Sequence, residues 1–465
     1  MAPKFGTSGL RGLVNELTDD LCGGYVTAFL QAVGPCGRLC IGRDLRPSSP
    51  RIAAAVTAAA RAMGVQVRDL GALPTPALAM AAGQMGAPAV MVTGSHIPAD
   101  RNGLKFYSPR GEITKSEEQA IAALMTAYVP LSALVTRPLG PSDPAGAVAY
   151  LARYVDFLGS QALAGMRIGV YQHSSVARDM LCELIAALGG APMALGRADH
   201  FIPVDTEAVS DEMRARLQDW AGDQPFDAIL SADGDADRPL LTDAAGKVIP
   251  GDILGHLSAR ALGANVVVTP VSSNTMIERA QVYDRVIRTK IGSPFVIAGL
   301  EQALATPCRP VGFEANGGFL LGFTAQRAGR ELAPLMTRDA VLPLLMPLIA
   351  AQKAGRGLSD LLVQLPQRRT AADRLERVET ERSLALVALL VRDADERAAF
   401  FDGLGVEVGL DLTDGLRVSF DNGLILHLRP SGNAPELRCY AEAETEAKAM
   451  AAMKDTLTRA ARRIA

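Results

Sequence analysis

Residues 38–71, RLCIGRDLRPSSPRIAAAVTAAARAMGVQVRDLG, indicate the fold class of this protein. It begins with the apolar run of a buried strand, continues through a helix over 48–64 that ends at Gly64, and finishes with a second strand over 65–71. Strand and helix alternate in this way from residue 20 to residue 95. Such alternation predicts a parallel sheet covered by helices.

The same order of elements returns twice further along the chain. Residues 166–263 form a second unit of strand, helix, strand, glycine-rich loop and helix, and residues 265–355 form a third, whose last helix is predicted over 338–355. A charged, linker-like segment at 365–377 follows. Two alternating strands around an Asp-Asn-Gly turn and an amphipathic helix over 445–465 then predict a separate α+β domain.

Composition and charge exclude several classes of protein. In 465 residues, 47 Lys and Arg stand against 50 Asp and Glu, so no basic surplus favours a nucleic-acid partner. The uncharged stretch Leu70–Ser95 is interrupted by prolines, and the N-terminus lacks a signal pattern, so we expect a cytoplasmic protein with no membrane partner. The 6 scattered cysteines are unlike a disulfide scaffold and are expected to be buried small hydrophobic residues.

An acidic loop indicates a metal site. Residues 233–238, DGDADR, follow an apolar strand, and carboxylates at alternate positions of an extended loop point to one side. An EF-hand does not fit, because Arg238 stands where that loop needs glycine and Ala244 where it needs glutamate. The alternative is an acidic hairpin turn, which the mutual repulsion of the carboxylates disfavours. The residues expected to converge on one hard cation such as Mg²⁺ are Asp233, Asp235 and Asp237.

A second loop carries a candidate nucleophile. Residues 90–109, VMVTGSHIPADRNGLKFYSP, are an apolar run that stops at a polar turn containing Ser95, and the strand that returns carries Lys105. Taken alone, Ser95 is more simply a turn residue. Beside a metal loop and several arginines it becomes a hydroxyl suited to phosphoryl transfer, which depends mostly on positioning and charge neutralisation.

Three further loops offer groups for a phosphorylated sugar. Residues 429–438, RPSGNAPELR, combine two guanidinium groups with a hydroxyl and loop amides, which suits a phosphate, although a solvated surface turn is the alternative. Residues 312–318, GFEANGG, place one carboxylate and one amide among glycines, as a reader of sugar hydroxyls would, although a lone glutamate in such a loop is weak evidence. Arg11, Arg43 and Arg46 come from two N-terminal loops and could equally be solvated charge.

These motifs, in this order over essentially the whole chain, resemble those of the α-D-phosphohexomutase family, the phosphomannomutases and phosphoglucomutases. The resemblance implies an α/β protein: three related α/β domains with mixed sheets plus a C-terminal α+β domain, around a central cleft. The implied domains are 1–150 with the phosphoserine loop, 151–255 with the metal-binding loop, 256–366 with the sugar-binding loop and 367–465 with the phosphate-binding loop.

The resemblance also implies a mechanism. Phosphorylated Ser95 passes its phosphoryl group to a hexose phosphate and takes the other one back from the bisphosphate intermediate, so that phosphate moves between the C6 and C1 oxygens. The implied cofactors are Mg²⁺, held by Ser95 and the three aspartates, and hexose 1,6-bisphosphate as activator. The implied catalytic residues are Ser95, His96, Arg11 and Lys105, and the implied substrate-binding residues are Arg238, Glu314, Asn316, Arg429, Ser431, Gly432, Asn433 and Arg438.

Some positions depart from the family pattern. Gly94 and Ile97 replace an alanine and an asparagine beside Ser95, and Gly318 stands where many bifunctional members have a histidine. Because the sequence resembles bacterial phosphomannomutases, we expect mannose 6-phosphate as the substrate and a monomer or homodimer as the active form. The alternatives are a phosphoglucomutase, a phosphoglucosamine mutase, a metal-dependent sugar phosphatase and a sugar-phosphate sensor without turnover.

Overall fold

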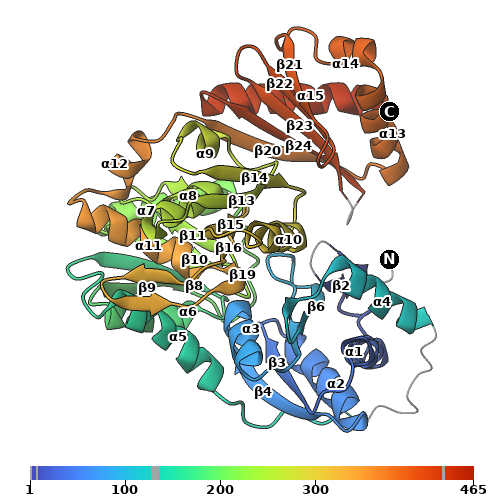
Figure 1. Ribbon diagram of the computed structural model, residues 1–465, viewed down its shortest axis with the longest axis vertical. Coiled ribbons are helices and arrows are strands. Elements are labelled where there is room, and N and C mark those ends of the chain that lie inside the picture. Colours follow the sequence, from blue (N-terminus) through green and yellow to red (C-terminus); the bar gives the residue numbers. More distant parts are fainter. Residues whose placement is uncertain (1–2, 7–8, 127–135, 432–434, 465) are drawn as a thin grey trace.

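The computed structural model describes residues 3–6, 9–126, 136–431 and 435–464, which form four large sheets with helices packed around them (Figure 1). The sheets follow one another along the chain. In Figure 1 the fourth sheet, in red at the top, is set apart from the first, in blue at the bottom. None of the helices in the described ranges is long and apolar enough to cross a membrane.

The first three sheets share one strand order. In each, the first strand of the unit lies between the second and third strands, which are both parallel to it, and an antiparallel fourth strand pairs with the third. These strands are β3 (Arg38–Arg43), β4 (Gln66–Ala72), β5 (Ala89–Val92) and β6 (Arg101–Ser108) in the first sheet, β8 (Arg167–His173), β9 (Ala191–Arg197), β10 (Ala228–Ala232) and β11 (Pro239–Thr242) in the second, and β13 (Val266–Pro270), β14 (Arg285–Thr289), β15 (Pro310–Phe313) and β16 (Phe319–Leu321) in the third. The three repeated units expected from the sequence are therefore present, and their sheets are mixed.

Shorter strands extend these sheets. Each sheet has one more strand antiparallel to its fourth: β2 (Leu10–Leu13), β12 (Val248–Ile249) and β19 (Leu335–Asp339). The remaining strands are β1 (Lys4–Phe5) and β7 (Gly111–Glu112), which join the first sheet, and β17 (Ala325–Arg327) and β18 (Arg330–Leu332), which pair with each other.

Helices connect the strands, and their ends follow from the local sequence. The first helix begins after Thr18, whose hydroxyl accepts a hydrogen bond from the Leu21 amide at 3.2 Å, and ends at Gly34, whose φ of 88° suits glycine. These helices are α1 (Asp19–Val33), α2 (Ser49–Ala62), α3 (Thr75–Gln84), α4 (Lys115–Thr126), α5 (Ala145–Leu158), α6 (Arg178–Ala187), α7 (Asp211–Asp223), α8 (Gly251–Leu262), α9 (Met276–Arg279), α10 (Ser293–Ala303), α11 (Val341–Lys353) and α12 (Leu358–Val363).

The predicted helix over 338–355 starts three residues too early. Its first two residues, Arg338 and Asp339, belong to strand β19, and the helix begins at Val341. The continuous apolar run that follows hid the end of the strand, because a short apolar strand and a buried helix look alike in sequence.

The fourth sheet is wholly antiparallel, with the order β20-β24-β23-β22-β21. The segment over 365–377, interpreted as a linker, instead contains edge strand β20, which pairs with β24 along its whole length. Most of its side chains are exposed, so the strand is rich in charge and lacks the alternation of a half-buried strand. The elements of this domain are β20 (Arg369–Glu376), β21 (Glu407–Asp411), β22 (Leu416–Phe420), β23 (Ile425–Pro430), β24 (Glu436–Ala443), α13 (Thr380–Arg392), α14 (Ala394–Phe400) and α15 (Glu446–Ile464).

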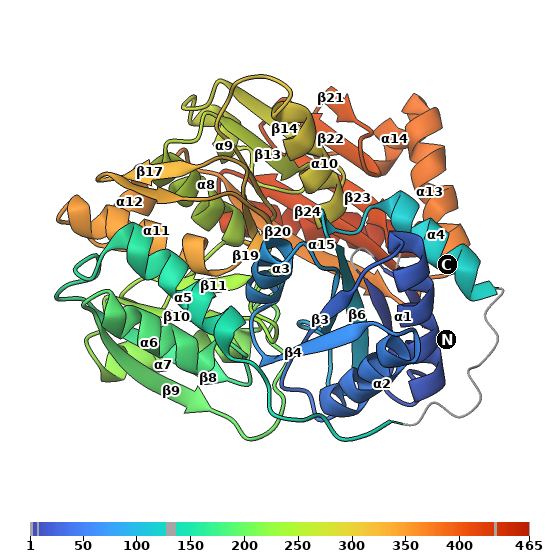
Figure 2. The ribbon, with the colours of Figure 1, turned by 60° about the horizontal axis from the view of Figure 1, so that its bottom comes forward.

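The apolar cores show which units are packed into one body. One large cluster of buried side chains runs through the first three units, whereas the fourth domain has a core of its own. Helix α3 of the first unit packs against α5 and against β19 of the third sheet (Figure 2). The predicted boundaries after residues 150 and 255 fall within helices α5 and α8, and the division into four domains stays a prediction.

Candidate active site

Each of the three related sheets presents a loop at the same topological position, between its third strand and its antiparallel fourth strand. Ser95 follows β5, the aspartate loop over 233–238 follows β10, and Glu314 follows β15. Three motifs far apart in sequence therefore occupy equivalent positions in the three sheets. The loops also meet, because Ser95 contacts the aspartate loop and Arg338 joins that loop to Glu314.

Ser95 lies against the aspartate loop. Its Oγ donates a hydrogen bond to Asp233 Oδ2 at 2.6 Å, and its side chain is fully buried. Its backbone has a φ of 54°, a left-handed conformation that is uncommon for serine, and its amide donates to Thr93 Oγ1 at 2.8 Å. The Nδ1 atom of His96 lies 3.4 Å from Ser95 Oγ. A strained turn held from both sides thus aims the hydroxyl at a carboxylate.

A buried arginine braces the serine loop. The guanidinium of Arg46 donates to the carbonyl oxygens of residues 95, 97, 98 and 101 at distances from 2.5 to 3.0 Å, and pairs with Asp44 at 3.1 Å. It also stacks over the ring of Phe201, 3.9 Å from the centroid. A Cβ atom at Gly94 would lie 2.6 Å from Arg46 Cζ, so glycine leaves room for the guanidinium. Arg46 therefore stabilises the serine loop. The other interpretation from the sequence, a solvated surface charge, is wrong for this residue.

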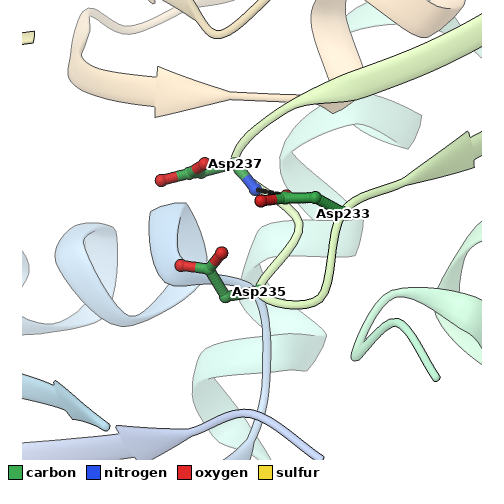
Figure 3. Close-up of side chains that lie close together, drawn as sticks. All are labelled: Asp233, Asp235 and Asp237. Atoms are coloured by element: carbon green, nitrogen blue, oxygen red, sulfur yellow. Dashed lines mark hydrogen bonds between the residues drawn. The ribbon is translucent and has the colours of Figure 1, made fainter. Parts of the chain in front are cut away.

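The three aspartates of the loop face a common space (Figure 3). One oxygen atom from each lies within 4.8 Å of the others, and all three side chains are buried. Asp233 Oδ1 accepts hydrogen bonds from the amides of Asp237 and Arg238 at 3.2 Å each. Within the described residues, the buried Oδ1 atoms of Asp235 and Asp237 have no hydrogen-bond donor. Buried carboxylate oxygens without donors, converging from one loop, fit a hard divalent cation.

Electrostatics support the same assignment. Burial, with Asp235 and Asp237 close by, raises the pKa of Asp233 well above its ordinary value. Burial would also raise the pKa of Asp237, but Arg338 and Lys105 outweigh it and the pKa is lowered. Asp233 thus resists ionising beside its acidic neighbours, whereas Arg338 and Lys105 favour the charged form of Asp237.

Basic side chains surround the triad. Lys105 is opposite Met91 on antiparallel strands β6 and β5, so the returning strand carries its ammonium back to the loop, as the sequence suggested. Its Nζ donates to Asp235 Oδ2 and Asp237 Oδ2, both at 2.5 Å. Burial and two neighbouring arginines lower the pKa of Arg11 to about 10. The basic residues that act electrostatically on the triad include Arg11, Lys105, Arg238 and Arg338.

The sugar loop is held close to the triad. Glu314 is buried, and its Oε1 lies 3.5 Å from Arg338 Nη1. Asn316 Oδ1 accepts from the Gly318 amide at 3.0 Å, and Asn316 O accepts from Thr206 Oγ1 at 2.9 Å. The side-chain oxygen of Asn316 therefore stabilises the sugar loop itself, whereas the carboxylate of Glu314 is directed at Arg338.

The phosphate loop comes from the fourth domain. Arg429 and Arg438 are directly opposite each other on β23 and β24. Arg429 Nε pairs with Asp414 Oδ2 at 2.8 Å, and Arg438 Nη2 pairs with Glu436 Oε2 at 3.2 Å. The Ser431 amide donates to the Glu436 carbonyl at 2.9 Å. Gly432 and Asn433, also predicted here, lie outside the described residues.

Other contacts connect the loops of the site. One cavity is lined by Ala315 of the sugar loop and by His427 and Tyr440 of the two strands that carry the phosphate loop. Thr75 of the first unit donates from its Oγ1 to Asp235 Oδ2 at 2.6 Å and from its amide to Asp235 O at 2.9 Å. Side-chain contacts thus link the serine, metal and sugar loops, and one cavity connects the sugar loop with the strands of the phosphate loop.

Two functional candidates escaped the sequence. Arg338 was placed in a helix, and Thr75 was assigned only as part of a helix. No local signal marks them, because the partners of each lie more than 20 residues away in sequence. For Arg338 the one available hint was a charged Arg-Asp pair ahead of a long apolar run.

Comparison with known proteins agrees with this geometry. Family models described as phosphoglucomutase/phosphomannomutase alpha/beta/alpha domain I, alpha/beta/alpha domain III and C-terminal domain match residues 2–130, 250–369 and 373–460. A phosphomannomutase from Sinorhizobium fredii is 46% identical and covers 96% of each chain. A phosphomannomutase from Salmonella muenchen is 42% identical, covering 95% of this chain and 92% of its own.

A solved structure shows the same fold. A phosphoglucomutase/phosphomannomutase family protein from Burkholderia thailandensis superposes with a TM-score of 0.76 at 22% identity, covering 98% of this chain and 96% of that one. The matching family models and the relatives at 46% and 42% identity show that the chain belongs to the α-D-phosphohexomutase family of phosphoglucomutases and phosphomannomutases, and that it is an isomerase.

Proposed function

We propose that the protein interconverts mannose 6-phosphate and mannose 1-phosphate through a phosphorylated Ser95 and a mannose 1,6-bisphosphate intermediate. The observation that carries the proposal is the placement of Ser95 Oγ, buried and 2.6 Å from a carboxylate of the triad. The names of the relatives at 46% and 42% identity favour mannose over glucose.

Phosphoryl transfer assigns a role to each group. The bond between phosphorus and Ser95 Oγ breaks as phosphorus bonds to a sugar oxygen, and the proton that the sugar hydroxyl loses is balanced by the one that Ser95 Oγ gains. Mg²⁺ bound by the three aspartates and the phosphoryl group would neutralise charge on the transferring group. Lys105 assists proton transfer, and Arg11 and His96 flank the transferred phosphoryl group. The second half-reaction reverses these bonds at the other end of the bisphosphate.

The substrate is held from two sides. Glu314 and Asn316 read hydroxyls of the sugar ring, and Arg238, which directly follows the triad in sequence, also binds the substrate. The phosphate that does not react binds to the loop of the fourth domain, through Arg429, Ser431, Gly432, Asn433 and Arg438. The intermediate must turn over between its two transfers, and hexose 1,6-bisphosphate added from outside restores enzyme that has lost its phosphoryl group.

The substrate is tested by comparing kcat/KM for mannose, glucose and glucosamine 1-phosphates on one magnesium-loaded preparation. We expect mannose 1-phosphate to rank first and turnover to rise with added bisphosphate. A higher value for glucose 1-phosphate would assign the enzyme to glucose instead. Steady release of inorganic phosphate without isomerisation would identify a phosphatase.

The nucleophile is tested with Ser95→Ala. Activity should fall by roughly 10⁴-fold or more, because loss of a nucleophile removes the covalent step. Intact mass should show one added phosphoryl group in the wild type and none in this variant. Ser160→Ala, which changes an exposed serine, is the matched control and should keep both properties. Unchanged turnover in Ser95→Ala would refute the mechanism.

The metal is tested by chelation. EDTA should abolish turnover, and Mg²⁺ should restore it. Calorimetric titration should show Mg²⁺ binding to the wild type and at least tenfold weaker binding to Asp235→Asn, since the change removes one negative ligand. Equal Mg²⁺ affinities in the two proteins would remove Asp235 from the metal site.

A further inference from the structure

The strand that ends the third sheet carries an arginine with no assigned role. Arg338 lies on β19, next to the residues that close the sugar loop, since Asp339 is opposite Phe319 on β16. The strand is anchored at this point, because Asp339 accepts hydrogen bonds from Tyr150 and Tyr154 of α5 at 2.6 and 2.5 Å. The backbone of Arg338 is therefore fixed relative to the site.

The side chain of Arg338 joins two of the functional loops. Its Nη2 donates to Asp237 Oδ2 at 2.8 Å, and its Nη1 lies 3.5 Å from Glu314 Oε1. Only 4% of the residue is exposed. A planar guanidinium can hold two carboxylates in fixed directions, which a lysine ammonium cannot reproduce. Arg338 thus bridges the metal loop and the sugar loop, with a hydrogen bond to the first and an ion pair to the second.

Gly318 makes room for this side chain. A Cβ atom at Gly318 would lie 2.7 Å from Cδ and 2.8 Å from Cγ of Arg338, closer than carbon atoms pack. A larger side chain at residue 318 and Arg338 in its present course are therefore mutually exclusive. Glycine at residue 318 departs from the family pattern, and it leaves the space that the Arg338 side chain on β19 occupies.

Glu314 remains able to act on a ligand. Within the described residues its buried Oε1 accepts no hydrogen bond, and the Arg338 guanidinium lies only at ion-pair distance from it. Buried acceptors are usually satisfied, so this oxygen is available to a sugar hydroxyl. The direction in which it points is set by the guanidinium beside it.

We propose that Arg338 is the residue that positions Glu314 and thereby sets the sugar preference of this enzyme, in the space that a side chain at residue 318 would otherwise fill. The inference rests on the proposed function, in which Glu314 reads the sugar. Arg338 acts through Glu314 and Asp237 and is a positioning residue.

The test compares Arg338→Met, Arg338→Lys and Gly318→Ala with Arg356→Met, which makes the same change at an exposed arginine of the third unit. Each protein is assayed with mannose and glucose 1-phosphates, and circular dichroism and melting temperature confirm folding. For Arg338→Met we expect kcat/KM for mannose 1-phosphate to fall about 10²-fold, mainly through KM, because a carboxylate that binds substrate loses its orientation. The ratio of kcat/KM between the two sugars should move toward 1.

The other variants separate positioning from charge. Arg338→Lys should recover less than a tenth of the lost kcat/KM, because one ammonium cannot hold both carboxylates. Gly318→Ala should move the sugar ratio in the same direction while keeping the guanidinium. Arg356→Met should match the wild type.

Two results would overturn the inference. One is a sugar ratio in Arg338→Met and Gly318→Ala within twofold of the wild type, and the other is full recovery by Arg338→Lys. A wild-type enzyme that does not interconvert hexose phosphates would instead refute the proposed function.

Discussion

Arg46 offers the sharpest test of how the serine loop is held. In Arg46→Met the apolar stem remains, but the donors to the four carbonyl oxygens and the partner of buried Asp44 are lost. Removing one member of a buried ion pair costs about 3 to 5 kcal/mol, because the other charge stays buried. We therefore expect a loss of about 4 kcal/mol in the free energy of unfolding of the body that the first three units form.

Calorimetry and hydrogen exchange measure this loss. Because one apolar core joins the first three units, they are expected to unfold together, and for a body of that size about 4 kcal/mol corresponds to a fall of roughly 5 °C in melting temperature. Amides over residues 93–102 should exchange faster, and kcat should fall about 10²-fold, because misplacing a nucleophile by about 1 Å costs that much. The matched control is Arg61→Met on exposed Arg61, which should stay within about 0.5 kcal/mol of the wild type.

A second substitution tests the same packing. Gly94→Ala would place its Cβ 2.6 Å from Arg46 Cζ, and we expect a cost of about 1 to 3 kcal/mol. In the Arg46→Met background the cost should nearly vanish, because the guanidinium atoms that it meets are gone. Melting temperatures of Arg46→Met within 2 °C of the wild type, or additive effects of the two changes, would refute the reasoning.

Other parts of the site give further predictions. Thr75→Val removes the 2.6 Å hydrogen bond to Asp235 and should weaken Mg²⁺ binding about tenfold in calorimetric titration, and unchanged affinity would contradict this. Asp414→Asn removes the carboxylate that holds Arg429 and should raise KM for hexose phosphates about tenfold in steady-state assays at an unchanged melting temperature. Burial raises the pKa of Asp252 to about 6, so its ionisation in the folded state destabilises the protein as pH rises from about 4 to about 6. Asp252→Asn should therefore be more stable than the wild type by about 3 kcal/mol at pH 7.5, with the difference shrinking toward pH 4 in thermal unfolding, and a difference independent of pH would refute the assignment.

Local sequence pattern was enough to place the elements of the first unit and the loops that carry chemistry. The alternation over residues 38–71 predicted strand, helix and strand, and these are β3, α2 and β4. The aspartates at 233, 235 and 237 could be assigned to one site because their spacing is local and carboxylates crowded on one loop need a cation. The recurrence of that strand order also indicated three related units, since each unit buries its apolar face by the same local pattern.

Which charged side chains belong to the site became evident from the three-dimensional contacts alone. Arg46 and Arg338 look like other arginines in sequence, yet one is buried under the serine loop and the other joins Asp237 to Glu314. Strand β20 looked like a linker, because an edge strand with mostly exposed side chains has little apolar pattern. These properties depend on partners tens to hundreds of residues away, and the burial that fixes a charge's partner and pKa exists only once the four units have packed together.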